Sequence, residues 1–423
     1  MLSALKSVWK IPDLRKKIIF TVLMFLVFRL GAHVPVPGIN GDAVKELLQT
    51  GTLFGFFDVI SGGAFKKFTV FAMGIMPYIN ASIIMQLLTI VIPSLERLSK
   101  EGEEGRKKLT QFTRYGTVVL GLIQASGMSF YLTRQPGVLL DPSWTSLVVI
   151  IISLTAGTAF LMWLGELITE YGIGNGISLI IFAGIVSRLP AGLYTLGSYL
   201  RAGTTNIASI ALFGVIAIVV IAGIVAIHEG QRRIPVQYAK RVVGRKMYGG
   251  QTTHIPLKVN QAGVIPVIFA MSILMFPTTI SAWFPTNKVA QYINTWFDPR
   301  SWVYMVLYAL LIIFFTYFYT AVTFNPADVA DNMKKYGGFI PGLRPGKPTA
   351  EYIDKILSRI TLAGAIFLAA IALLPNLVMG ITGLDIYFGG TGLLIVVGVA
   401  LETMKQLESH LLMRNYQGFM KKM

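Results

Sequence analysis

The segment TVFAMGIMPYINASIIMQLL, at residues 69–88, decides the fold of this chain. It is apolar enough to enter a membrane, yet Gly74 and Pro77 interrupt it. Such breaks are tolerated in a membrane helix only where the freed backbone groups find partners inside the protein. Ser82 and Gln86 follow four residues apart and therefore share one helix face. The segment thus predicts a helix that faces other helices or a water-filled cavity rather than lipid alone.

A second segment repeats the pattern Gly-x-x-Pro-x-Ile. GIMPYI at residues 74–79 is matched by GVIPVI at residues 263–268. Interrupted apolar segments at corresponding positions of two halves indicate a transport pathway at an inverted repeat. A chance match in a chain rich in glycine and isoleucine is the alternative interpretation.

The composition excludes several classes of protein. Hydrophobic residues make up 54% of the chain and charged residues 13%, whereas soluble domains carry about 25% charged residues. With a mean hydropathy of +0.64, this predicts an integral membrane protein rather than a soluble helical one. The chain has no cysteine and four scattered histidines, which argues against thiolate or histidine-rich metal sites, so no cofactor is expected.

The hydropathy pattern predicts an all-α fold with ten transmembrane helices. Five spans in each half is an odd number, so the halves, at residues 1–200 and 201–423, would have inverted topology around a central pore. The predicted spans lie at residues 18–33, 73–92, 115–132, 146–168, 177–189, 208–227, 262–283, 302–324, 360–379 and 391–407.

Basic residues predict the orientation. The face that carries both termini holds 28 of the 37 lysine and arginine residues, and the opposite face holds eight. This asymmetry predicts that both termini are cytoplasmic. The basic segments 229–260 and 325–358 on the same face are too long to serve topology alone, so we expect them to dock a large acidic partner.

Few ionisable residues fall within the predicted spans. Arg29 lies in the first span, and Glu166 lies near the cytoplasmic end of the fourth. Ion coupling usually needs buried ionisable residues, so it is poorly supported here, whereas an apolar pore can close by dewetting. Phosphate-loop, metalloprotease and serine-hydrolase motifs are missing, and no enzyme activity is expected. A secondary transporter of a small solute, or an insertase or scaffold without a through-path, are the alternatives.

Several further segments are long and distinctive. Beside residues 69–88, they are MWLGELITEYGIGNGISLII at 162–181, GQRRIPVQYAKR at 230–241, THIPLKVNQAGVIP at 253–266, TAVTFNPADVADNMKKYGGFIPGLRPG at 320–346 and YFGGTGLLIVV at 387–397. With these motifs the chain resembles the SecY family, the channel subunits of the general protein translocase. The resemblance implies an hourglass pore in the bacterial cytoplasmic membrane. Such a channel passes unfolded secretory chains across the membrane and releases apolar helices sideways into the lipid bilayer.

The resemblance also implies partners and sites. SecE and SecG would be small membrane subunits, SecA or the ribosome would dock on the cytoplasmic loops, and signal sequences and nascent polypeptides would be the substrates. The implied pore ring consists of Ile75, Ile79, Ile177, Ile181, Ile268 and Ile395. A helical plug at residues 54–66 would include Phe54, Phe57, Ile60, Gly62, Gly63 and Phe65, although an interfacial re-entrant helix is the alternative there. The implied lateral gate, where the second and third spans face the seventh and eighth, includes Ser82, Ile83, Gln86 and Ser272. The implied docking residues are Arg241, Arg245, Lys246 and Arg344.

Overall fold

The computed structural model describes residues 11–44, 58, 61–141, 143–203, 206–238, 241–243, 246–248, 252–284, 287–298, 301–382 and 390–420. Long helices occupy all ten predicted spans. In chain order they are α2 (Pro12–Gly31), α5 (Met76–Val91), α7 (Glu103–Thr133), α8 (Trp144–Tyr171), α9 (Gly176–Val186) continued by α10 (Leu189–Arg201), α11 (Ile207–Glu229), α12 (Ile265–Trp283), α14 (Trp302–Thr323), α16 (Lys347–Thr382) and α17 (Gly390–Met420).

Six stretches among the described residues are long and apolar enough to cross a membrane by length and composition. They are α7, α8, α9 with α10, α11, α14 with its extension α15 (Pro326–Lys335), and α16. The other predicted spans correspond to α2, α5, α12 and α17. Helix α5 is followed by α6 (Pro93–Lys100), which is bent from it by 100°.

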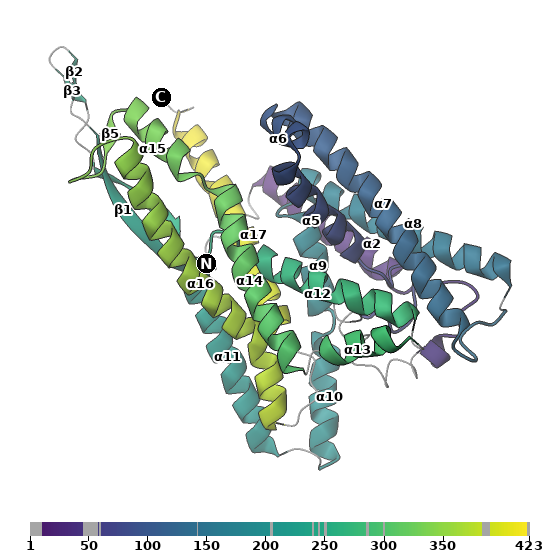
Figure 1. Cartoon of the computed structure of the whole chain (residues 1–423). Helices are drawn as coiled ribbons and strands as arrows, with labels where there is room; N and C mark the ends of the chain where they lie inside the picture. The colour runs from purple at the N-terminus through teal and green to yellow at the C-terminus, as the bar shows by residue number, and fades with distance from the viewer. Residues whose placement is uncertain are drawn as a thin grey trace.

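The helices form two groups (Figure 1). Helices α2, α5, α7 and α8 lie on one side of the molecule, and α11, α14, α16 and α17 lie on the other. Helix α12 joins the groups, because it packs against α14 as well as against α5 and α7. Helix α9 does the same from the first half, because it packs against both α8 and α17.

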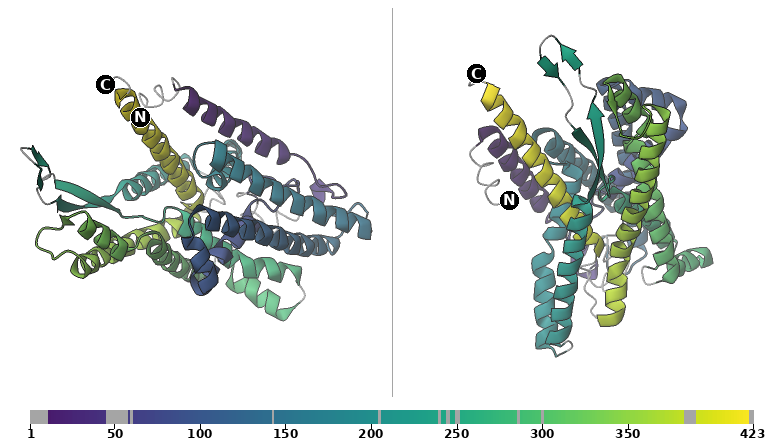
Figure 2. Two further views of the ribbon diagram at one scale, coloured as in Figure 1. Left: turned by 90° about the horizontal axis from the view of Figure 1, so that it is seen from above. Right: turned by 90° about the vertical axis from the view of Figure 1, so that its left-hand side faces the viewer.

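Five short strands depart from the expected all-α fold. Strand β1 (Gln231–Tyr238) pairs antiparallel with β4 (Thr252–Lys258) and with β5 (Gly338–Phe339). Ile234 and Val236 of β1 are buried between exposed neighbours, which is the two-residue period of a strand with one buried face. Strands β2 (Arg241–Val243) and β3 (Lys246–Tyr248) form a hairpin that projects beyond the helices in all views (Figures 1 and 2).

Several helix boundaries also differ from the prediction. Helices α7 and α16 begin 12 and 13 residues before the predicted spans, because their polar first turns continue the same helix out of the apolar region. Helix α5 begins at Met76 rather than at residue 73, because the preceding residues 61–75 form turns. Pro77 therefore lies in the first helical turn, where its missing N–H has no bond to lose.

Candidate pore, plug and gate

The two repeated segments have the same backbone conformation. Gly74 has φ +58° and Gly263 has φ +64°, a left-handed region that favours glycine. The residues that follow them, Ile75 and Val264, are the N-caps of α5 and α12, with φ, ψ of −98°, 5° and −93°, −7°. The repeated sequence pattern thus encodes one local structure used twice.

The same turns place an isoleucine in each helix. Pro77 and Pro266 occupy the first turn of their helices. Ile79 donates its backbone N–H to the Ile75 oxygen at 3.1 Å, and Ile268 donates its own to the Val264 oxygen at 3.3 Å. Helices α5 and α12 pack against one another, and both isoleucines are buried in a hydrophobic cluster with members from both helix groups.

The candidate ring residues gather in one hydrophobic cluster. The buried members come from the start of α5 and from α9, α12 and α17, and they are Ile75, Ile79, Ile181, Ile268 and Ile395. Ile177 is only half-buried and packs against this cluster. Its side chain lies on α8, where a Cβ added to Gly165 would be 2.4 Å from Ile177 Cδ1. Five of the six candidates are thus buried together, and the sixth lies closer to α8.

Only part of the candidate plug lies within the described residues. Phe54, Phe57 and Ile60 fall outside them. Gly62 and Gly63 have φ +67° and +89°, so residues 61–66 form turns rather than the expected helix. Phe65 is buried and packs with Phe68. The helical assignment therefore does not hold for residues 61–66, because two consecutive left-handed residues cannot continue an α-helix, whereas Asp58 is helical.

The turns of residues 61–66 contact the first half of the chain through charged side chains. Arg29 of α2 donates from Nη1 to the Gly62 oxygen at 2.8 Å. Asp58 forms an ion pair with Arg188, which follows α9. Arg29 was expected as an ionisable residue within a span, whereas no role was predicted for Asp58 or Arg188. A carboxylate among the apolar residues FGFFDVI was the available signal.

The candidate gate residues belong to α5 and α12, which pack against one another. Gln86 Nε2 donates to Ser82 Oγ at 3.1 Å, a bond within α5. The Gln86 side chain also lies near the Tyr319 side chain of α14, which belongs to the other helix group. Ile83 is buried in the shared cluster. Ser272 Oγ is buried and has no hydrogen-bond partner among the described residues.

On the far side of α12, aromatic rings join it to α14. Phe269 meets Phe315 and Tyr319 edge to face, with ring centroids 5.8 Å apart in both pairs. Edge-to-face pairs contribute about 0.5–1.5 kcal/mol beyond the area that they bury. The α12–α14 contact is therefore held by specific ring packing.

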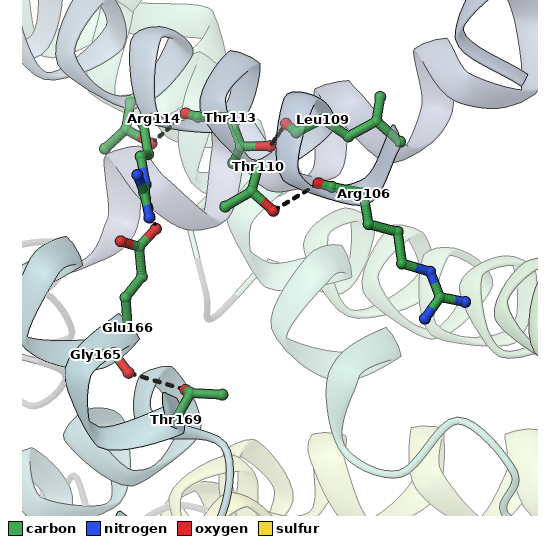
Figure 3. Close-up of polar contacts among 9 residues, drawn as sticks. Arg106, Leu109, Thr110, Thr113, Arg114, Gly165, Glu166 and Thr169 are labelled. Carbon is green, nitrogen blue, oxygen red and sulfur yellow. Dashed lines mark hydrogen bonds and ion pairs between the residues drawn. The ribbon is translucent and has the colours of Figure 1, made fainter. Parts of the chain in front are cut away.

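An ion pair joins α7 to α8 (Figure 3). Arg114 Nε donates to Glu166 Oε1 at 2.8 Å. Thr169 donates to the Gly165 oxygen at 2.9 Å and also accepts the Gly176 N–H at 2.8 Å, which links α8 to α9. Glu166 thus has a structural partner, which weakens its case as an ion-coupling residue.

The candidate docking residues lie in two loops at one end of the molecule. Arg241 and Lys246 belong to the β2–β3 hairpin, and Arg245 lies outside the described residues. Arg344 is exposed, and its backbone oxygen accepts from Thr349 Oγ1 at 2.8 Å. The hairpin, α15 and α6 lie at the same end in Figure 1.

Helix α6 at this end carries both charge signs. Lys100 Nζ donates to Glu96 Oε1 at 2.6 Å. This hydrogen bond and the lysine charge hold the pKa of the Glu96 carboxyl below its usual value. Helix α6 thus brings a paired acidic side chain to the end of the molecule that holds the described candidate docking residues.

Comparison with known proteins gives consistent results. A sequence profile of the SecY family matches residues 69–404. The chain is 51% identical to "Protein translocase subunit SecY" of Halalkalibacterium halodurans over 431 aligned positions, with 100% of both chains covered. It is 48% identical to the protein of the same name from Thermus thermophilus, with 99% of this chain and 98% of the relative covered.

Solved structures share the fold. One described as "The structure of a protein conducting channel" aligns with a TM-score of 0.67 and 20% identity, covering 93% of this chain and 92% of the other. Another, "Sec61 in the Canine ribosome-channel complex from the endoplasmic reticulum", aligns with a TM-score of 0.64 and 19% identity over the same shares. The arrangement of helices in this chain is therefore the fold that these structures share.

Proposed function

Because the chain belongs to the SecY family, we propose that it is the pore-forming subunit of a protein-conducting channel in the bacterial cytoplasmic membrane. One observation of the geometry supports this most directly. The repeated turns at Gly74 and Gly263 start α5 and α12 in the same way and bring Ile79 and Ile268 into one apolar cluster between the two helix groups. Such a cluster can close a pore without any charged residue.

In this proposal, the ring of Ile75, Ile79, Ile177, Ile181, Ile268 and Ile395 seals the waist of the channel. The side chains are apolar, so water leaves the constriction and ions cannot cross. Isoleucine has a stiff χ1 angle, which gives the ring a defined profile around a moving chain. The half-buried position of Ile177 against α8 suggests that it supports the ring rather than narrowing it.

The plug would consist of residues 54–66, seated beside the ring on the outer side. The described part supports a seated position, since Phe65 is buried and Arg29 holds the Gly62 oxygen. The left-handed glycines allow this segment to change direction when it leaves.

The lateral gate would open between α5 with α7 and α12 with α14. Two features favour separation here at low cost. Ser272 makes no hydrogen bond within the described residues that opening would break, and the Ser82–Gln86 bond lies within a single helix. The Gln86–Tyr319 contact is a polar link across the gate and would be lost on opening.

Partners of the proposed channel follow from its family and its charge. SecE and SecG are the expected small membrane subunits. SecA and the ribosome would compete for the basic end with Arg241, Arg245, Lys246 and Arg344, which the proposed topology places in the cytoplasm with both termini. The chain itself would perform no chemistry, and the motor or the ribosome would supply the energy.

Reconstitution tests this function. Vesicles containing the chain, its small subunits and the motor should import an unfolded secretory precursor in an ATP-dependent manner, so that the precursor becomes protected from added protease. Matched vesicles without this chain are the control. Uptake of a small solute against an ion gradient, with no precursor import, would instead indicate the transporter.

A further inference from the structure

The candidate plug contains an unusual charge. Asp58 is 4% exposed and, among the described residues, it is the one buried side chain of the Asp, Glu, Lys and Arg types. A carboxylate removed from water is strongly unfavourable unless a cation and hydrogen bonds replace its hydration. The environment of Asp58 therefore has to supply both.

Both carboxylate oxygens of Asp58 have partners. Oδ2 pairs with Arg188 Nη1. Oδ1 accepts the backbone N–H of Lys66 at 2.7 Å. The Asp58 backbone oxygen also accepts the Gly63 N–H at 2.8 Å. Asp58 thus binds residues 63 and 66 of the turns through hydrogen bonds. Its ion pair with Arg188 connects the same turns to the end of α9.

The same segment is held a second time from α2. Arg29 Nη1 donates to the Gly62 oxygen at 2.8 Å. Gly62 also lies close to α9, since a Cβ added to it would be 2.9 Å from Gly184 Cα and 3.2 Å from Ser187 Oγ. All these contacts come from the first half of the chain. These contacts hold the segment on α2 and α9, so a movement of α12 and α14 would not by itself break them.

We propose that Asp58 and Arg188 act as a clasp that sets the resting equilibrium between the seated and released plug. The inference rests on the proposed plug function and names the residues that hold the seated state. Release has to separate the pair, because Arg188 belongs to the helix scaffold whereas Asp58 moves with the plug. Once separated, both charged groups regain water, so the released state is reachable and the clasp is reversible.

The two partners are not equivalent, which gives the proposal a specific signature. The side chain of Arg188 is 29% exposed, whereas that of Asp58 is 6% exposed. Neutralising Arg188 leaves a buried carboxylate without its cation, whereas neutralising Asp58 leaves a guanidinium that water can reach. Arg188→Gln should therefore release the plug more than Asp58→Asn does.

A single cysteine can report the position of the plug, because the chain has none of its own. Ser61 is buried at 4% exposure, so Ser61→Cys is a nearly isosteric reporter. In sealed vesicles that contain the complete complex, a membrane-impermeant maleimide added from the outer face should label it slowly. Adding Arg188→Gln should raise the labelling rate about tenfold or more, as expected for an uncompensated buried charge. Asp58→Asn should raise the rate less.

Three further variants separate a clasp from general loosening. The double variant Asp58→Asn with Arg188→Gln should label no faster than Arg188→Gln alone, since both changes remove one interaction. Arg188→Lys keeps the positive charge and should retain most of the protection. Arg201→Gln removes an exposed arginine from α10 and should leave the rate unchanged.

The outcomes distinguish the clasp from the plug itself. Parental labelling rates in both Arg188→Gln and Asp58→Asn would overturn the clasp, and the second variant covers the case in which the first does not fold. In another outcome, deletion of residues 57–65 opens the channel while the reporter thiol at position 61 stays protected in Arg188→Gln and Asp58→Asn. That combination would support the plug function and contradict the clasp. If that deletion leaves resting conductance unchanged, the proposed plug function fails.

Discussion

Gly74 and Gly263 adopt the same left-handed conformation, with φ of +58° and +64°, each two residues before the start of its helix. Helix α5 belongs to one helix group, α12 joins the two groups, and the two helices are in contact. Because the turn is the same at both sites, the backbone conformation of the glycine helps to set the direction in which each helix starts. Packing in the shared apolar cluster also contributes.

Replacing either glycine by alanine should destabilise the protein. A residue with a Cβ pays about 1–2 kcal/mol for the left-handed conformation. Around Gly263 no described atom lies within 4 Å of an added Cβ, so strain alone would act there, and around Gly74 the nearest atom is 3.7 Å away. The thermal unfolding midpoint of the purified protein measures the effect. Gly214→Ala in α11, which meets no described atom within 4 Å, should leave stability unchanged or raise it.

Polar substitution in the candidate ring should make the resting channel leak. Changing Ile75, Ile79 and Ile268 to serine lets water remain in the constriction, so ion conductance through planar bilayers should rise several-fold. Ile84→Ser is the matched control, because Ile84 lies on the same α5 but is 45% exposed. If the triple variant conducts no more than the control, these residues do not form the ring.

Arg344→Glu should slow translocation driven by SecA without disturbing the fold. The Arg344 side chain is exposed, while its backbone oxygen is held by Thr349 Oγ1. Charge reversal at a docking surface weakens association, and the defect should change with ionic strength. Precursor import and motor affinity are the measurements. Lys355→Glu in α16 reverses another exposed charge and should have a smaller effect, and equal defects would contradict a specific role of Arg344.

The Arg114–Glu166 pair should contribute modestly to the packing of α7 on α8. Arg114 is about half exposed and Glu166 is 20% exposed, so a double-mutant cycle with Arg114→Gln and Glu166→Gln should give a coupling of about 0.5–1 kcal/mol. Unfolding midpoints of the four proteins measure it. If Glu166 instead served ion coupling, Glu166→Gln would abolish transport with no such coupling to Arg114.

Sequence periodicity predicted the long helices well, because twenty apolar residues have few other stable arrangements. The repeated Gly-x-x-Pro-x-Ile pattern predicted two matching sites, although Pro77 and Pro266 start their helices rather than interrupt them. The β1–β4 ladder was not predicted, because the exposed residues Arg232 and Arg233 interrupt the alternation of polar and apolar residues. Only Ile234 and Val236 of β1 follow that alternation as buried apolar residues.

The contacts of the candidate plug could not be predicted from hydropathy or from a repeated motif. Asp58 and Arg188 are separated by 130 positions, and the sequence around each residue does not predict that the two side chains will meet. Likewise, the unbonded Ser272 hydroxyl and the Gln86–Tyr319 contact depend on how α12 sits between α5 and α14 in the described part of the chain. Such long-range polar pairs follow from tertiary packing, which a single sequence does not fix.

Single-channel recording tests the central claim most directly. The intact protein and a variant lacking residues 57–65 would be compared in planar bilayers at rest. A plugged protein-conducting channel predicts a silent intact protein and large, flickering openings in the deletion variant. Silence in both proteins would contradict the account and favour a carrier or a scaffold without a through-path.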